Sequence, residues 1–230
     1  MTSVSGALDL TAAALLLDMD GTLVDSGDAV VRSWNRLFQE LGSAERFDHR
    51  FHGTPARGVL RRVFPDMDDA EMQWAFTRIE DLEVADVDEV HALPGTEDLL
   101  AALDAAARDL DRPTWTIVTS CTQRLFAARW ARTGLPVPDG LITADEVHRG
   151  KPDPEPYLRG AAAVGIAPEH CLVVEDSVGG LEAGRGAGCR TLAITTTTPA
   201  EALAPGADAV IDSLVGLRVS VEDDHLRLLR

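Results

Sequence analysis

The sequence predicts an α/β fold, in which a doubly wound parallel sheet carries a small inserted helical domain. Short apolar runs that end in acidic, hydroxyl or glycine residues recur along the chain, and most of them are followed by a helical pattern. This alternation is typical of a parallel sheet covered by helices on both faces. With 230 residues and 45% hydrophobic content, the chain is long enough to bury a sizeable core.

The strands of the sheet are expected where uniformly apolar runs precede polar clusters, because strands buried on both faces show no polar alternation. In chain order these runs are AALLLDMDGT, WTIVTSC, DGLITADE, HCLVVEDSVGG, CRTLAITT and ADAVIDS. Helices are predicted over residues 123–133, 155–164 and 178–187, each ending at a glycine. The C-terminal VSVEDDHLRLLR alternates as a terminal strand or hairpin does.

Residues 26–93 interrupt this pattern with helical periodicity and no convincing strand. One expected helix presents Val30, Trp34, Leu37, Phe38 and Leu41 on one face. A second begins with a capping box, in which Asp68 is the N-cap and Glu71 lies three residues later. The predicted organisation is therefore a core domain formed by residues 1–25 and 94–230, with a helical cap domain over residues 26–93.

Composition narrows the possible partners and location. A net charge of −17 repels phosphate-rich polymers and anionic lipid, so we expect neither nucleic acid nor membrane as a partner. The three cysteines, at positions 121, 171 and 189, lack the spacing of a zinc site or a redox pair. The N-terminus carries no basic segment of a secretory signal. We therefore expect a cytoplasmic protein that is a monomer or a weak dimer.

Several carboxylates are expected to meet at one crevice, because ligands of doubly wound sheets bind at the carboxyl ends of the strands. The first strand run ends in Asp18 and Asp20, and the VVEDS run ends in Glu175 and Asp176. Carboxylates brought this close repel one another unless a cation or shifted pKa values compensate them. An oxygen-ligated Mg²⁺ with a substrate phosphate in its shell satisfies this requirement.

Lys151 is the only lysine among 21 basic residues. An ammonium group is a compact point charge, whereas a guanidinium is a broad planar fork. If arginine has replaced lysine elsewhere in this chain, the position that keeps lysine is one where the exchange fails. We therefore predict that Lys151 lies between a carboxylate and a bound phosphoryl group.

Together the segments DMDGT, VTS, GKP and VVEDS resemble the four ordered motifs of the haloacid dehalogenase superfamily of phosphatases. The resemblance spans almost the whole chain and implies that superfamily's α/β core. The predicted helical insertion resembles the cap of the subgroup that includes β-phosphoglucomutase and many sugar and polyol phosphatases.

The resemblance implies a role for each motif residue. Asp18 would be the nucleophile that forms an aspartyl-phosphate, and Asp20 the general acid and base. Thr119 and the backbone amide of Ser120 would bind the phosphoryl group together with Lys151. The Mg²⁺ ligands would be Asp18, Asp20 through its backbone carbonyl, Glu175 and Asp176.

Residues near the motifs have expected supporting roles. Gly21 permits a tight turn after the nucleophile, and Thr22 orients Asp20. Ser177 caps the helix that begins at position 178. On the cap loop FHGTPARGV, His52 and Arg57 are candidates for substrate contact.

Among the reactions of this superfamily, the sequence favours hydrolysis of a sugar or polyol monophosphate. Asp20 argues against a dehalogenase, and the absence of lysine from the cap argues against phosphonate cleavage through a Schiff base. A β-phosphoglucomutase-type phosphomutase stays an alternative, although Ala56 stands where we expect its cap arginine. A receiver-like phospho-acceptor is a third reading, but it needs neither Asp20 nor a cap.

Overall fold

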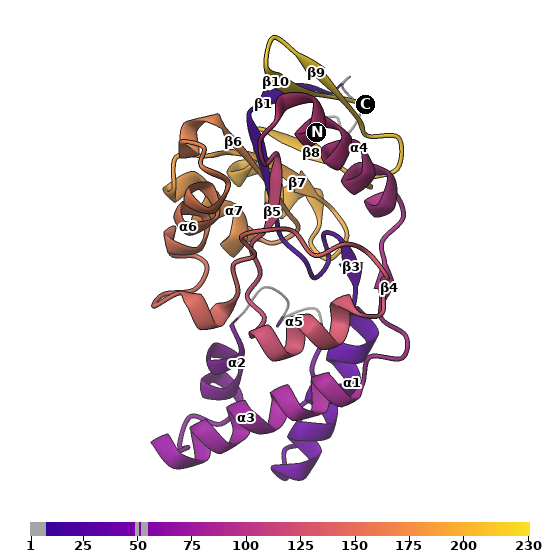
Figure 1. The fold of residues 1–230 in the computed structure, drawn as a ribbon. Helices are drawn as coiled ribbons and strands as arrows, with labels where there is room; N and C mark the ends of the chain where they lie inside the picture. The colour runs from indigo at the N-terminus through magenta and orange to yellow at the C-terminus, as the bar shows by residue number, and fades with distance from the viewer. Residues whose placement is uncertain (1–7, 49–50, 52–54) are drawn as a thin grey trace.

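A five-stranded parallel sheet lies at the centre of the computed structural model, which describes residues 8–48, 51 and 55–230 (Figure 1). Its strand order is β5-β2-β6-β7-β8. The bounds are β2 Ala14–Leu17, β5 Trp115–Ile117, β6 Cys171–Glu175, β7 Arg190–Ile194 and β8 Ala209–Ile211. The predicted fold class is confirmed.

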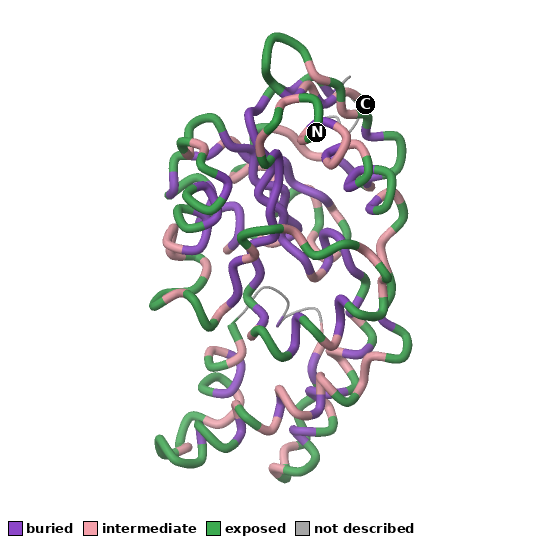
Figure 2. The backbone as a smooth tube through the Cα atoms, viewed as in Figure 1, coloured by how far each residue is buried: buried purple, intermediate pink, exposed green. Residues whose placement is uncertain are grey.

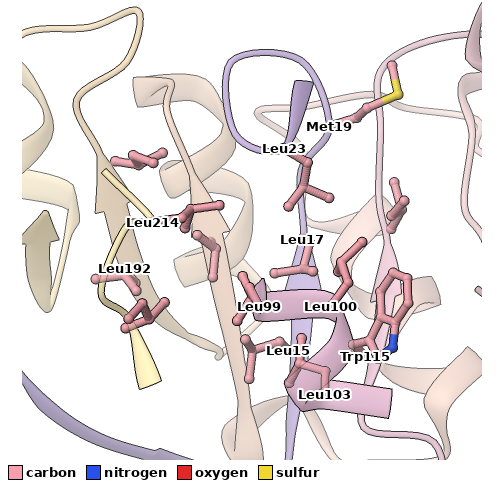
Figure 3. Close-up of a cluster of buried hydrophobic side chains, with 14 of the residues drawn as sticks. Leu15, Leu17, Met19, Leu23, Leu99, Leu100, Leu103, Trp115, Leu192 and Leu214 are labelled. Carbon is pink, nitrogen blue, oxygen red and sulfur yellow. The ribbon is translucent and has the colours of Figure 1, made fainter. Parts of the chain in front are cut away.

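Both faces of the sheet are covered, which explains why β2 consists of apolar residues alone. Leu15 and Leu17 belong to a cluster that includes leucines of α4 (Thr96–Leu110). Ala14 and Leu16 belong to one that includes residues of α6 (Glu155–Val164) and α7 (Val178–Gly186). All four β2 side chains are fully buried. The centre of the sheet is coloured as buried in Figure 2, and Figure 3 shows Leu15 and Leu17 beside Leu99, Leu100 and Leu103. Successive side chains of a strand point to opposite faces, so a strand between two helical layers must be apolar at every position.

The helices of the core start and stop where local signals place them. They are α4 Thr96–Leu110, α5 Gln123–Trp130, α6 Glu155–Val164, α7 Val178–Gly186 and the short α8 Ala200–Leu203. The helix α6 has its predicted bounds, and Gly165 follows it with a left-handed backbone. The helix α5 ends three residues before its predicted end, and α7 ends one residue before its own. In both, the residues that follow form a turn that is not α-helical.

A second, antiparallel sheet joins the two ends of the described chain. It consists of β1 Asp9–Ala12, β10 His225–Leu229 and β9 Arg218–Glu222, in that order. The predicted C-terminal hairpin is therefore confirmed. Its turn residues Asp223 and Asp224 both have positive φ, as a two-residue turn with right-handed strand twist requires.

One predicted strand is wrong. The DGLITADE run forms only an isolated bridge between Ile142 and Val118 within the described chain. Thr143 is the N-cap of a 3-10 helix and forms a capping box with Glu146, so the chain turns immediately after the bridge. The local capping signal therefore prevails over a short apolar run.

In the described part of residues 26–93, three α-helices share a hydrophobic cluster of their own, at the end of the molecule opposite the termini (Figure 1). They are α1 Gly27–Glu40, α2 Ala56–Val63 and α3 Asp69–Ala85. The predicted capping box of Asp68 and Glu71 is present at the start of α3. The exact boundary of a cap domain stays a prediction.

The expectation of no strand in residues 26–93 is wrong at one point. The two-residue strand β4 His91–Ala92 pairs antiparallel with β3 Val24–Asp25. These are the segments that lead into and out of the helical region, so the pairing holds them side by side. Two residues are too few to give a period-two pattern.

Candidate active site

The carboxyl ends of β2, β5 and β6 deliver polar side chains to one cavity of about 590 Å³. Asp18 follows β2, Thr119 follows β5, and Glu175 and Asp176 lie at the end of β6. Residues of α1 and α3 complete the wall on the helical side. The cavity therefore lies between the sheet and the helical region, with charged groups at the sheet end.

Lys151 lies among the acidic side chains, as its uniqueness in the sequence predicts. Its Nζ donates hydrogen bonds to Asp18 Oδ1 at 2.6 Å, Glu175 Oε1 at 2.8 Å and the Val118 carbonyl at 2.8 Å. Its side chain is 8% exposed, and the ring of Tyr157 lies 4.8 Å from the nitrogen. All three N–H groups thus have an acceptor, which is what a buried ammonium requires.

Glu175 is hydrogen-bonded at both carboxylate oxygens. Oε1 accepts from Lys151 and from the Tyr157 hydroxyl at 2.9 Å, while Oε2 accepts from the amides of Asp176 and Ser177 and from the Ser177 hydroxyl. Burial acts to raise the pKa of Glu175, but the Lys151 ammonium and these hydrogen bonds outweigh it and hold the pKa below its ordinary value. Glu175 is therefore ionised and fixed in place.

Asp18 and Asp176 have fewer compensating contacts than Glu175. Burial raises the pKa of Asp18 to about 7 against the lowering effect of Lys151, with repulsion from Glu175 adding to the rise. Burial, followed by repulsion from Glu175 and Asp18, raises the pKa of Asp176 well above its ordinary value. One oxygen from each of Asp18, Glu175 and Asp176 lies within 4.8 Å of the others, a spacing that can accommodate a metal ion. With all three groups ionised, the cluster would hold more negative charge than Lys151 neutralises.

Gly21 and Gly180 let the backbone approach this cluster. Gly21 has φ of +81°, and a Cβ there would lie 2.2 Å from Asp176 Oδ2. A Cβ at Gly180 would lie 1.7 Å from Glu175 Oε1. The predicted tight turn at Gly21 and the predicted helix cap at Ser177, whose hydroxyl accepts from the Gly180 amide, are both confirmed.

Asp20 lies in the same cavity but has different partners. The Ser26 hydroxyl donates to Oδ1 at 2.5 Å, and the Cys121 thiol to Oδ2 at 3.0 Å. Arg129 Nη1 lies 3.0 Å from Oδ1. The predicted orienting role of Thr22 is wrong, because the buried Thr22 hydroxyl has no hydrogen-bond partner among the described residues and Ser26 contacts Asp20 instead.

The site geometry agrees with the similarity of the chain to known proteins. Residues 15–194 match the haloacid dehalogenase-like hydrolase family. The chain belongs to this family. Hexitol phosphatase A of Escherichia coli (strain K12) is 38% identical over 206 residues, which are 89% of this chain and 93% of that protein. The 2-deoxyglucose-6-phosphate phosphatase 1 of Saccharomyces cerevisiae is 34% identical and covers 94% of both chains.

The fold of the haloacid dehalogenase-like hydrolases is also found among solved structures. A hydrolase from Pseudomonas syringae superimposes with a TM-score of 0.79 at 21% identity, covering 89% of this chain and 94% of its own. The predicted family and hydrolase class are confirmed, and the curated relatives favour a phosphatase over a phosphomutase. Among the described residues, no helix has the length and apolar character needed to span a bilayer.

Of the two cap residues predicted to contact substrate, the structure describes only Arg57, which does not line the cavity. Arg57 is exposed on α2, where its Nη2 donates to Gln73 at 2.6 Å and its guanidinium lies over the ring of Phe76 at 4.6 Å. These partners within the helical region hold the side chain. His52 lies outside the described residues, so its role stays a prediction.

Several cavity residues were not predicted. The Thr197 hydroxyl makes a short hydrogen bond to Asp176, although the TTTT run reads as a plain loop. Asp20 is contacted by Ser26 and Arg129, and Arg129 in turn lies beside Glu83. A buried arginine on an amphipathic helix has no distinctive spacing, so the sequence offers no signal for it.

Glu83 should make the stability of this hydrolase depend on pH. Burial raises its pKa to about 7, although Arg129 opposes the rise. Because the folded-state pKa exceeds the unfolded value, the folded state keeps a proton that the unfolded state releases between about pH 4.5 and pH 7, and stability falls across that window. Glu83→Gln removes this penalty, so its gain over wild type should grow with pH to roughly 1–3 kcal/mol at pH 7.5.

Urea unfolding of both proteins between pH 4.5 and 8 measures this difference. The exposed Glu182→Gln change on α7 is the matched control, for which we expect a constant difference across the range. Parallel curves for wild type and Glu83→Gln would contradict the expected shift.

Proposed function

We propose that this protein is a Mg²⁺-dependent phosphatase that hydrolyses small sugar or polyol monophosphates through an aspartyl-phosphate at Asp18. The observation that carries the proposal is the position of Lys151, whose Nζ lies 2.6 Å from Asp18 Oδ1 and faces the cavity that Asp176 also lines. The most similar relatives reported above act on hexitol phosphates and on 2-deoxyglucose 6-phosphate by name.

The first half-reaction transfers the phosphoryl group to the protein. Asp18 attacks phosphorus, forming a carboxylate–phosphorus bond as the bond to the sugar or polyol oxygen breaks. Asp20 gives a proton to the departing oxygen, which leaves as an alcohol. Lys151, the Thr119 hydroxyl and the Ser120 amide neutralise or hydrogen-bond the phosphoryl oxygens as charge moves onto them.

The second half-reaction releases phosphate. Asp20, now deprotonated, takes a proton from a water molecule as that water attacks phosphorus, and the bond to Asp18 breaks. Arg129 Nη1 lies 3.0 Å from Asp20 Oδ1 and holds this carboxyl group in position for the two proton transfers. The cycle returns Asp18 to its carboxylate form and Asp20 to its protonated form.

The acidic cluster fits a magnesium ion. Asp18 and Asp176 offer carboxylate oxygens of the hard type that Mg²⁺ prefers, and Gly21 leaves space beside Asp176 that any side chain would fill. Because both oxygens of Glu175 already accept hydrogen bonds, we assign Glu175 to holding Lys151, with at most a water-mediated contact to the metal. The Asp20 backbone carbonyl would complete the protein ligands. A bound Mg²⁺ would supply positive charge that keeps Asp18 ionised and polarises the phosphoryl group.

Phosphate release from a panel of monoesters tests the proposal. With Mg²⁺ present we expect steady multiple turnover on hexitol phosphates and sugar 6-phosphates, because the ion offsets the repulsion among the buried acids. Removal of Mg²⁺ by a chelator should lower the rate at least ~100-fold, and added Mg²⁺ should restore it.

Three outcomes would contradict the proposal. Chelator-resistant turnover would argue against the metal. A single phosphorylation without turnover would favour the receiver-like alternative. Formation of glucose 6-phosphate from β-glucose 1-phosphate would favour the phosphomutase.

A further inference from the structure

Arg129 lies buried in the wall of the catalytic cavity and has hydrogen-bond donors without an acceptor. It is near the end of α5, its side chain is 4% exposed, and Nη1 contacts Asp20 and the Cys121 sulfur. Its Nε and Nη2 atoms have no hydrogen-bond acceptor among the described residues. Burial of unpaired donors of a charged group is costly, so these atoms indicate an acceptor that arrives from outside the chain.

Glu83 faces Arg129 from α3, on the helical side of the cavity. Its Oε1 lies 3.5 Å from Arg129 Nη2, close enough for ionic attraction but without a hydrogen bond between the two. The Glu83 side chain is 12% exposed and lines the same cavity. The cavity wall thus presents a hydrogen-bond donor group beside a hydrogen-bond acceptor. A hydroxyl group both donates and accepts, so one hydroxyl can bind the two residues together.

The residues around Arg129 and Glu83 indicate which class of hydroxyl compound the cavity would bind. Trp34, Phe76 and Ile79 line the helical part of the cavity and offer apolar contacts for a carbon chain. The charges nearest to Arg129 are carboxylates, Asp20 and Glu83. A ligand carboxylate or a second phosphate would therefore approach negative groups with only one guanidinium to offset them, whereas a neutral hydroxyl meets no such repulsion.

We propose that Arg129 and Glu83 form a hydroxyl-binding pair for the part of the substrate that is not transferred, so that the cavity selects neutral hydroxylated monophosphates over carboxylated or bisphosphorylated compounds. This inference rests on the proposed phosphatase function and assigns its specificity to two particular residues. Because Glu83 belongs to α3 and Arg129 to α5, the same hydroxyl would also bridge the helical region and the core.

Glucitol 6-phosphate and hexyl phosphate test the pair, since both carry one phosphate on a six-carbon chain and differ in hydroxyl groups. We expect wild type to prefer glucitol 6-phosphate in kcat/KM. In Glu83→Met, which keeps side-chain length, this preference should fall roughly 10–100-fold, the effect of losing a hydrogen bond to a charged group. The fall should come mainly from KM for the polyol ester, with hexyl phosphate little changed.

Asp81→Asn is the matched control. It removes a negative charge from a half-buried position on the same helix, outside the cavity lining, and should leave the preference unchanged. If Glu83→Met does not fold, Arg129→Lys gives the second test, because it keeps a positive charge but removes the Nε and Nη2 donors. It should lower the same preference.

Binding to the Asp18→Asn protein, measured by calorimetry with both esters, separates this inference from the proposed function. A preference for glucitol 6-phosphate that Glu83→Met removes supports the pair, even if wild type proves unable to turn over any ester. Turnover with an unchanged preference in both variants would overturn the pair and leave the phosphatase standing. A wild-type preference for phosphoglycolate or a sugar bisphosphate would overturn it equally.

Discussion

Replacement of Asp18 by asparagine is expected to lower phosphate release at least ~10⁴-fold while preserving the fold. The carboxamide has the shape of the carboxylate but is too poor a nucleophile to form the bond to phosphorus. Lys151 keeps its hydrogen bonds to Glu175 and to the Val118 carbonyl, so the buried ammonium retains acceptors. The change also removes one of the charges that repel Asp176.

Steady-state phosphate release and intact-protein mass measure this effect. Wild type quenched in acid during turnover should show a fraction heavier by one phosphoryl group, and Asp18→Asn should show none. Asp109→Asn is the control, because it removes an exposed carboxylate on α4 that does not line the cavity, and it should keep full activity. More than a tenth of wild-type turnover in Asp18→Asn, or phosphorylation that persists in it, would exclude Asp18 as the nucleophile.

Replacement of Lys151 by arginine is expected to reduce kcat/KM at least ~1000-fold and to destabilise the protein by about 1–3 kcal/mol. The single nitrogen of Lys151 donates to three acceptors, which lie at the ends of the three strands β2, β5 and β6. A planar guanidinium is too broad for this position and too rigid to donate hydrogen bonds to all three acceptors. Lys151→Met should be worse for stability, by about 3–5 kcal/mol, because it leaves the buried Glu175 carboxylate without its cation.

Denaturant unfolding measures the expected loss of stability, and steady-state kinetics on the same preparations measure the expected loss of kcat/KM. The neighbouring Arg149→Lys change is the matched control, since Arg149 is largely exposed and its ion pair with Asp153 contributes little. We expect it to alter stability by less than ~0.5 kcal/mol. Wild-type activity in Lys151→Arg would show that positive charge alone is sufficient here, and the explanation for the single lysine would be wrong.

Much of the fold could be predicted because its signals are local. The apolar run of β2 marks a strand covered on both faces, and the capping box at Asp68 marks the start of α3. The strand predicted at DGLITADE is wrong because a second local signal was overlooked. The capping box at Thr143 starts a 3-10 helix and turns the chain before a strand can form. The pairing of β3 with β4 was missed because two residues carry no periodic pattern.

The reactive end of the site could be predicted for a different reason. Asp18, Thr119 and Asp176 each follow a strand of a parallel sheet, and the carboxyl ends of such strands meet at one edge. Lys151 is a loop residue, but its uniqueness in the chain drew attention to it. It then meets Asp18, which lies 133 positions away in the sequence.

The substrate end of the site could not be predicted. Arg129, Glu83 and Ser26 come from α5, α3 and the segment before α1, and nothing in their spacing indicates that they meet around Asp20. Arg57, which the loop sequence offered as a candidate, instead contacts Gln73 and Phe76. The contacts around Asp20 depend on how the helical region packs against the core, and those of Arg57 depend on how α2 packs against α3.

By itself, then, the sequence determined the parallel sheet, the helices that cover it and the acidic groups at its edge. Burial on two faces requires uniformly apolar strand segments, and helix ends require capping residues, so both can be recognised in the sequence. The tertiary structure alone decided that Glu175 accepts hydrogen bonds at both oxygens, that Thr197 contacts Asp176, and that Arg129 lies between Asp20 and Glu83. The physical reason is that a hydrogen bond between distant side chains depends on the position and angle of packed elements, which no short stretch of residues encodes.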